Sequence, residues 1–100
     1  MKKVTIVISY KLKKGTDIEE FLAASEKLND EYMSKQKGYI SWRQLNEKDT
    51  WVDALTFESM EDAKRIEEND NPCELALKFY SYINLPSCRM NYYTIEKEYK

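Results

Sequence analysis

The chain has 100 residues, of which 42% are hydrophobic and 34% are charged, with only 2 glycines and 2 prolines. This length and composition are typical of a single folded domain over residues 1–100 and argue against disorder. Its net charge is −2 with both signs interspersed, so we expect no nucleic-acid partner, which normally requires a basic patch. The chain has no histidine, which removes the usual general base near neutral pH, the usual haem ligand and most zinc sites.

Nothing in the sequence predicts export or a membrane partner. The segment that follows Met1, Lys2 and Lys3 alternates in polarity, unlike the apolar core of a signal peptide, and no run approaches about 20 apolar residues. We therefore expect a cytoplasmic protein. Cys73 and Cys88 are then expected to be free thiols in a reducing compartment. No glycine-rich phosphate loop or paired-cysteine motif is present, so no metal and no cofactor is expected.

The first predicted elements are a strand and a helix. Residues 4–13 alternate, and one face is strongly apolar and should pack on helices. That face holds Val4, Ile6, Ile8, Tyr10 and Leu12. The opposite face, with Thr5, Val7, Ser9 and Lys11, is mixed, which suits a lined cavity. The run Thr16-Asp17-Ile18-Glu19 matches a capping box and predicts the start of a helix, for which Gly38 is a candidate C-cap.

A β-hairpin is predicted next, with strands over residues 39–46 and 50–57. If its loop has two residues, Asn46 pairs with Trp51, Gln44 with Asp53, and Trp42 with Leu55. One face of the hairpin then carries Ile40, Trp42, Gln44, Asn46, Trp51, Asp53, Leu55 and Phe57. The other carries Tyr39, Ser41, Arg43, Leu45, Val52, Ala54 and Thr56. A different loop length would change this register and exchange the faces.

The last third predicts two helices and a strand. Ser59 is expected to cap the first helix, and Met60, Ala63 and Ile66 should face inward. After a break at residues 69–72, Asn71 is expected to cap a short helix with Pro72 at its first position. Its inner face would carry Leu75, Phe79 and Tyr82. A final strand is predicted from Cys88 to about Lys97, with Met90, Tyr92 and Thr94 on one face.

The order strand, helix, strand, strand, helix, strand indicates an α+β domain of ferredoxin-like βαββαβ topology. We expect a four-stranded antiparallel sheet with helices on one face and an extra short helix before the last strand. The uncovered face should then contact a partner, a ligand or both.

Three short motifs carry a family resemblance: Gly38-Tyr39, Trp51-Val52-Asp53, and Phe57-Glu58-Ser59-Met60-Glu61-Asp62-Ala63. With these motifs in this order, the chain resembles the dimeric α+β barrel superfamily, and within it the antibiotic-biosynthesis-monooxygenase-like proteins. The resemblance implies a homodimer through the helix-free sheet faces, which would line a pocket. It also implies a small hydrophobic or aromatic ligand and an activity of the cofactor-independent monooxygenase type.

The sequence departs from the family pattern at two places. Phe57 stands where the family often has tryptophan, and Ile66 stands near a position where the family commonly has histidine. The haem-degrading branch is similar in fold but relies on a set of asparagine, tryptophan and histidine. Since the chain has no histidine, haem degradation is disfavoured.

The candidate site residues come mainly from the hairpin. Asp53 is a candidate general base if burial raises its pKa, with Asn46 as a second catalytic candidate. Asp53 could instead pair with Arg43 or Arg89, or accept a hydrogen bond from an indole N–H. The candidate substrate-binding residues are Trp42, Trp51, Phe57, Gln44, Ser9 and Asn91. The alternatives are aromatic interface packing for the rings and turn formation for the asparagines.

Two other functions share this order of elements. A non-enzymatic ligand-binding or regulatory module stays open as the alternative to an enzyme. An RNA-recognition domain is disfavoured, because residues 50–55 lack the glycine and the basic start of its signature.

Overall fold

The computed structural model describes all 100 residues, and its secondary structure follows the predicted order. Three α-helices, one short 3₁₀ helix (η1) and four strands occur in the order β1 (Val4–Leu12), α1 (Ile18–Glu31), η1 (Met33–Lys35), β2 (Tyr39–Glu47), β3 (Thr50–Phe57), α2 (Met60–Glu67), α3 (Glu74–Tyr80) and β4 (Ile83–Thr94). The strands form one antiparallel sheet in the order β2-β3-β1-β4. This is the predicted ferredoxin-like α+β topology.

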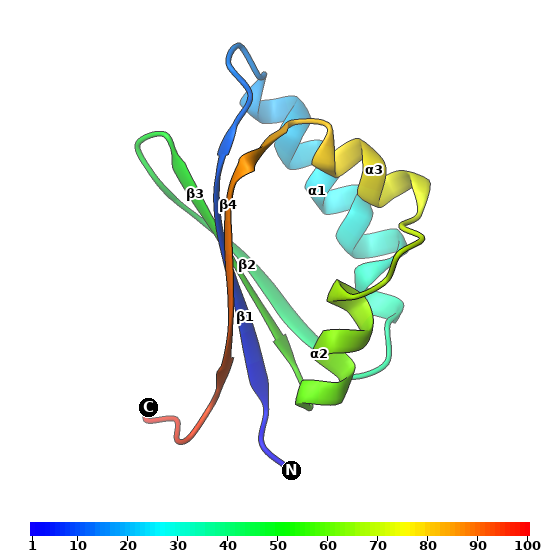
Figure 1. Cartoon of the computed structure of the whole chain (residues 1–100), viewed down its shortest axis with the longest axis vertical. Coiled ribbons are helices and arrows are strands. Elements are labelled where there is room, and N and C mark those ends of the chain that lie inside the picture. Colours follow the sequence, from blue (N-terminus) through cyan, green and yellow to red (C-terminus); the bar gives the residue numbers. More distant parts are fainter.

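The molecule has two layers. All the helices lie on one face of the twisted sheet, with α1 and α3 side by side toward one end and α2 toward the other, and the second face is uncovered (Figure 1). Both termini lie at the same end of the sheet. Any cavity enclosed within one chain therefore has to form between the helix layer and the covered face of the sheet.

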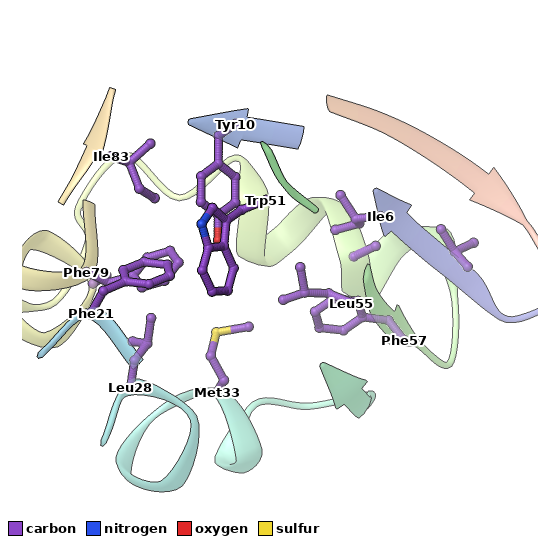
Figure 2. Packing of buried hydrophobic residues seen from close by; sticks show 13 residues of the cluster. Ile6, Tyr10, Phe21, Leu28, Met33, Trp51, Leu55, Phe57, Phe79 and Ile83 are labelled. Carbon is purple, nitrogen blue, oxygen red and sulfur yellow. The ribbon is translucent and has the colours of Figure 1, made fainter. Parts of the chain in front are cut away.

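The core forms between these layers, as the alternation of β1 predicts. Val4, Ile6 and Tyr10 are at most 2% exposed, and Thr5, Val7 and Ser9 lie on the uncovered face. Figure 2 shows the buried rings of Phe21 from α1 and Phe79 from α3 next to each other; they stack with centroids 5.4 Å apart. The first strand is thus the centre of the core, paired on both sides.

The hairpin register is confirmed. Trp42 pairs with Leu55, Gln44 with Asp53, and Asn46 with Trp51 around a two-residue turn. The prediction is wrong at the start of β2, where Ile40 is the extra residue of a β-bulge. Tyr39 therefore packs against Phe57, with ring centroids 6.0 Å apart, and Ile40 is exposed on the uncovered face.

Three predicted helix caps are corrected, and one is confirmed. Asp17, not Thr16, caps α1, because its Oδ1 accepts the backbone N–H groups of Glu19 and Glu20, while the Thr16 hydroxyl donates back to Lys13 O. The short helix α3 starts at Glu74 with Cys73 at the N-cap, so Asn71 does not cap it. Ser59 caps α2 as predicted, accepting from the Asp62 N–H. Gly38 does not cap α1, since η1 lies between them.

The last strand begins earlier than predicted, at Ile83 rather than Cys88, and ends at Thr94. The register against β1 shifts between Ser9 and Lys11, so that an irregular segment around Pro86 interrupts β4. An edge strand tolerates such a proline, because one row of its backbone groups has no partner strand. Cys73 and Cys88 are both free thiols, as expected.

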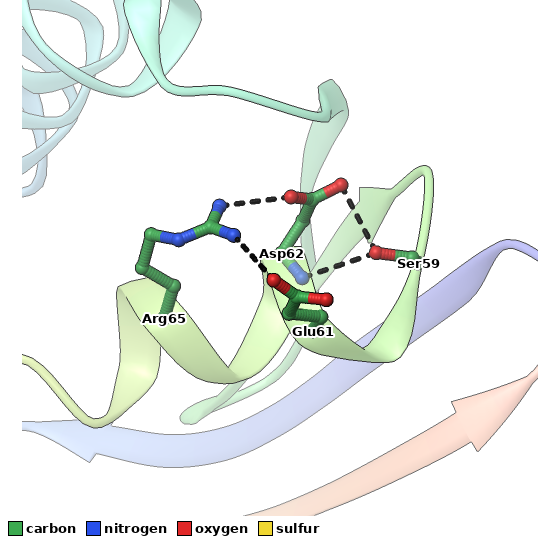
Figure 3. Close-up of polar contacts among 4 residues, drawn as sticks. All are labelled: Ser59, Glu61, Asp62 and Arg65. Carbon is green, nitrogen blue, oxygen red and sulfur yellow. Dashed lines mark hydrogen bonds and ion pairs between the residues drawn. The ribbon is translucent and has the colours of Figure 1, made fainter.

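Gly38 lies against the first turn of α2. Its φ is +82°, and a Cβ at this position would overlap the side chain of Asp62. Asp62 is itself held by the Ser59 hydroxyl, which donates to Oδ2 over 3.0 Å, and by Arg65, which donates to Oδ1 over 2.8 Å (Figure 3). The hydrogen bond from Arg65 lowers the pKa of the Asp62 carboxyl. The contact between Gly38 and Asp62 therefore fixes the position of α2 relative to the start of β2.

Candidate functional site

A cavity of about 140 Å³ lies between the covered face of the sheet and the helices. Its floor and inner wall are apolar and come from β1, β2, β3, α1, η1 and α3. The apolar residues with this role include Ile8, Leu28, Met33, Trp42, Leu55 and Phe79. An engineered protein cavity of about 150 Å³ holds one benzene molecule, so this space matches a single aromatic ring.

The cavity opens beside the connection between α2 and α3. This mouth is more polar than the floor, and six of the residues that line it are Tyr32, Glu67, Asn69, Pro72, Cys73 and Tyr80. Asn69 and Tyr80 are exposed, whereas Asp53 at the floor is 2% exposed. The inner end of the cavity, at Asp53, is therefore shielded from solvent, and we call it the dry end. The outer end, at Asn69 and Tyr80, is open to solvent, and we call it the wet end.

Asp53 is the one charged side chain at the dry end. The Tyr10 hydroxyl donates to its Oδ1 over 2.9 Å. No group donates to Oδ2. This oxygen keeps some accessible surface, and it therefore faces the cavity that Asp53 lines. Burial raises the pKa of this carboxyl to about 7, and the Tyr10 hydrogen bond offsets part of that rise. Asp53 can therefore take up and release a proton near neutral pH.

The indole of Trp42 is the second polar feature at this end. Its Nε1 is the sole buried side-chain nitrogen or oxygen without a hydrogen-bond partner. The N–H lies close enough to Asp53 to lower the pKa of the carboxyl, but it does not reach hydrogen-bond geometry. This nitrogen has almost no accessible surface, so its N–H faces the Asp53 carboxyl and does not open to the cavity.

Tyr10 is held in a small polar network behind the cavity. Burial, and then the neighbouring Asp53 carboxylate, keep the pKa of Tyr10 far above its usual value, so the phenol remains a donor. Gln44 lies beside Tyr10 and donates from Nε2 to Ser25 Oγ over 2.9 Å. Ser25 in turn donates to Phe21 O over 2.9 Å. The Tyr10 hydrogen bond thus fixes the orientation of the Asp53 carboxyl, and the Gln44–Ser25 hydrogen bond joins β2 to α1.

Glu67 brings a second carboxyl to the cavity, at the last residue of α2. Burial raises its pKa, and its charge raises the pKa values of Asp53 and of the Tyr80 phenol. It forms no ion pair, since the four ion pairs of the chain involve other carboxylates. The two carboxyls thus line one small space.

Of the predicted site residues, the structure brings Asp53 and Trp42 to the cavity. Gln44 lies one step behind, in the network with Ser25. Trp51 and Phe57 belong to the core instead: Trp51 packs edge-on against Phe21 at 5.2 Å, and Phe57 is fully buried (Figure 2). These two rings lie on the same sheet face as Asp53 but do not line the cavity.

The other three predicted residues lie elsewhere. Asn46 is exposed and donates to Lys48 O and Thr50 O, which stabilises the hairpin turn. Ser9 and Asn91 lie on the uncovered face, next to Val7 and Val52 by the strand register. The resemblance implied a pocket on that face, whereas the cavity that holds Asp53 lies on the covered one.

Sequence reasoning missed Tyr10 and Glu67 as site residues. Tyr10 was placed correctly in the apolar face of β1, but its contact with Asp53 depends on the β1–β3 register, which a hairpin loop does not determine. Glu67 offered a signal, because it follows Ala63 by four residues and so falls on the inward stripe of α2.

Neither a protein-family model nor a curated protein sequence matches the chain. No helix in the structure is both long and apolar enough to span a bilayer. The recognisable relationships are therefore structural.

The structure is similar to several solved structures over nearly its whole length. SnoaB from Streptomyces nogalater, a cofactor-independent oxygenase, superimposes with a TM-score of 0.77 at 15% identity, covering 98% of this chain and 97% of that one. A protein from Chloroflexus aurantiacus, provisionally named an antibiotic biosynthesis monooxygenase, gives 0.72 at 10% identity, with coverages of 98% and 97%. A similarly named protein from Nitrosomonas europaea gives 0.68 at 15% identity, with coverages of 93% and 89%. The chain therefore has the ferredoxin-like α+β fold of the antibiotic-biosynthesis-monooxygenase-like proteins.

Proposed function

We propose that this protein binds a small, single-ring aromatic molecule in the cavity and oxygenates it without a cofactor, with Asp53 as the general base. The observation that carries the proposal is a 2%-exposed carboxyl with a pKa of about 7, whose free oxygen opens to an apolar space of about 140 Å³. The fold likeness to SnoaB, itself a cofactor-independent oxygenase, supports the reaction class.

The chemistry needs a ligand with an acidic proton. Asp53 Oδ2 accepts that proton from a phenolic O–H, or from a C–H group that the ring acidifies. The Trp42 N–H beside the carboxyl favours its ionised form, which is the form that accepts the proton. The cavity excludes water from the resulting anion, which makes it a better electron donor to O₂.

Atoms and electrons balance with O₂ as the oxidant. The substrate anion transfers an electron to O₂, a carbon–oxygen bond forms, and the product is a hydroperoxide. Its O–O bond then breaks with loss of water and leaves a carbonyl group. A CH₂ group, which in a hydroquinone is the ring carbon next to the hydroxyl in its keto form, and one O₂ thereby become a C=O group and one water, so no further reductant is needed.

Oxygen uptake with a monocyclic hydroquinone tests the proposal. We expect uptake by the wild type and a loss of about 100-fold or more in Asp53→Asn, since general bases contribute roughly 10² to 10⁴ in rate. Asp49→Asn, an exposed change in the hairpin turn, is the matched control and should retain activity. Equal uptake by Asp53→Asn would remove Asp53 as the base. Binding without any uptake would instead favour the non-enzymatic binding module.

We also propose that two copies pair through the uncovered sheet face, as the family resemblance implies. The centre of that face carries Val7, Val52 and Ala54, and Leu45 and Tyr93 are exposed at its flanks. Sedimentation should then show a dimer. Ala54→Lys, which places a charge at the centre, should shift it to a monomer, whereas Leu22→Lys on exposed α1 should not. A wild-type monomer at micromolar concentration would contradict the pairing.

A further inference from the structure

The charges around the cavity are all of one sign. Two carboxyls, Asp53 and Glu67, line it, and none of the 16 lysines and arginines of the chain does. The arginine nearest to Glu67 in sequence, Arg65, is engaged outside the cavity, where it donates to Asp62 and Glu61 (Figure 3). The site therefore repels an anionic ligand and favours a neutral or cationic one.

Of the two cavity carboxyls, Glu67 is the one that lacks a partner. It is half-buried at the cavity mouth and forms neither a hydrogen bond nor an ion pair. Partial burial penalises an unpaired charge, and a cationic group of a ligand beside Glu67 would offset that penalty. The cavity that Glu67 lines is a second, independent feature, since its volume of about 140 Å³ is enough for one aromatic ring.

Aromatic rings line the same cavity as Glu67. Tyr80 and Tyr32 line the mouth, and Trp42 and Phe79 meet edge-to-face below them with centroids 5.4 Å apart. The electron-rich faces of such rings attract cations, most strongly where water is excluded. A carboxylate beside aromatic rings is the arrangement that recognises an ammonium group attached to an apolar body.

We propose that the cavity binds a monocyclic arylalkylamine in its protonated form, with the ring beside Trp42 and Phe79 and the ammonium at Glu67. The ring fills the dry end, and the ammonium lies at the wet end, where part of its hydration is retained. This inference deepens the proposed function by naming a ligand class, but it rests only on the shared cavity and needs no turnover.

Three probes with the same phenethyl-type body test the proposal: phenethylamine, phenethyl alcohol and hydrocinnamate, which are cationic, neutral and anionic at neutral pH. Their binding is measured by the quenching of tryptophan fluorescence, since Trp42 lines the cavity, and by calorimetry. We expect the amine to bind about tenfold more tightly than the alcohol, the range of one hydrogen bond to a charged group, and the acid to bind most weakly.

Variants at the end of α2 identify the residue responsible. Glu67→Gln should remove the preference for the amine over the alcohol while leaving the affinity for the alcohol unchanged. Glu68→Gln makes the same change in net charge at an exposed neighbour that does not line the cavity, and should keep the preference. Since Glu67 has no partner to lose, we expect Glu67→Gln to fold, and Glu67→Ala provides a second variant with the same expectation.

Every outcome of the binding measurements either supports or overturns the proposed preference for an amine. Equal binding of the three probes, tighter binding of the acid, no binding of any probe, or a preference that survives in Glu67→Gln would overturn the proposal. Amine binding without oxygen uptake would leave this inference standing and remove the proposed reaction. Oxygen uptake from a neutral hydroquinone with no amine preference would do the reverse.

Discussion

The Tyr10 hydroxyl on β1 donates to Asp53 Oδ1 on β3 over 2.9 Å, across two strands at the centre of the sheet. In the strand register Asp53 is opposite Ile8, so the tyrosine reaches it diagonally. One oxygen of the carboxyl is thereby fixed, and the other is left for the cavity. The reactivity of Asp53 then depends on a residue that does not itself line the cavity.

Tyr10→Phe should raise the pKa of Asp53 above its wild-type value of about 7. The hydrogen bond stabilises the ionised carboxylate and so lowers its pKa. Without it, less of the rise in pKa that burial causes is offset. A ¹³C NMR titration of the Asp53 carboxyl measures the shift, and the pH dependence of oxygen uptake should move upward with it. Tyr39→Phe is the control, because the Tyr39 hydroxyl donates to Asn29, on α1. An unchanged Asp53 titration in Tyr10→Phe would contradict this role.

The free energy of unfolding should fall as the pH rises from about 4 to 7. The Asp53 pKa is raised from 3.8 to about 7, so in this window the folded state holds a proton that the unfolded state has released. The stabilisation is fully present below the unfolded pKa and is lost through the folded pKa. Relative to the wild type, Asp53→Asn, which stays neutral, should therefore be more stable at pH 8 than at pH 5, by roughly 2–3 kcal/mol at most.

Urea unfolding at the two pH values measures this difference. Asp70→Asn, an exposed change on the loop between α2 and α3, is the control and should show the same pH dependence as the wild type. Glu67 adds to the effect in the same direction, since burial raises its pKa too. If Asp53→Asn and the wild type lost stability in parallel, the proton on Asp53 would have no part in the effect.

Gly38→Ala should be considerably more destabilising than Gly15→Ala. Both glycines have a φ of +82°, so both substitutions incur the backbone cost of about 1 kcal/mol. A Cβ at Gly15 meets nothing within 4 Å, whereas one at Gly38 overlaps Asp62 and displaces it from Ser59 and Arg65. Thermal unfolding should show an extra loss of roughly 1–3 kcal/mol for Gly38→Ala. Equal losses would show that Asp62 moves aside without cost.

The fold was predictable because its elements are encoded locally. Alternation in β1, the two-residue loop of the hairpin and the Ser59 cap each depend on a few neighbouring residues. The errors arose where local signals compete or are absent. Asp17 and Thr16 both suit an N-cap, and the bulge at Ile40 leaves no mark in the sequence.

The site was only partly predictable because a cavity is a relation between distant segments. Asp53 could be singled out as a charge in an apolar strand. Trp42 could be singled out because the predicted register pairs it with Leu55, two positions from Asp53. Trp51 is likewise an aromatic residue on the same face of the hairpin. Its pairing with β1 and its contact with Phe21 nevertheless place it in the close-packed core. Which ring borders a void depends on how α1 and α3 pack, and no single segment encodes that.

Ala76→Leu should fill the cavity without loss of stability. Ala76 is 6% exposed on α3 and lines the empty space, so a larger side chain gains contacts there. Ala63 on α2 is 0% exposed and does not line the cavity, so Ala63→Leu has no space and should cost about 1–3 kcal/mol by overpacking. Chemical denaturation should therefore separate the two variants.

The same pair tests where the ligand binds. Ala76→Leu should weaken the binding of phenethyl alcohol by about tenfold or more, because the leucine occupies the volume that the ring needs. Ala63→Leu, where it remains folded, should bind the alcohol like the wild type. Undiminished binding in Ala76→Leu would place the ligand outside this cavity. If Ala76→Leu were instead as unstable as Ala63→Leu, the space between the sheet and α3 would have to be closed in solution.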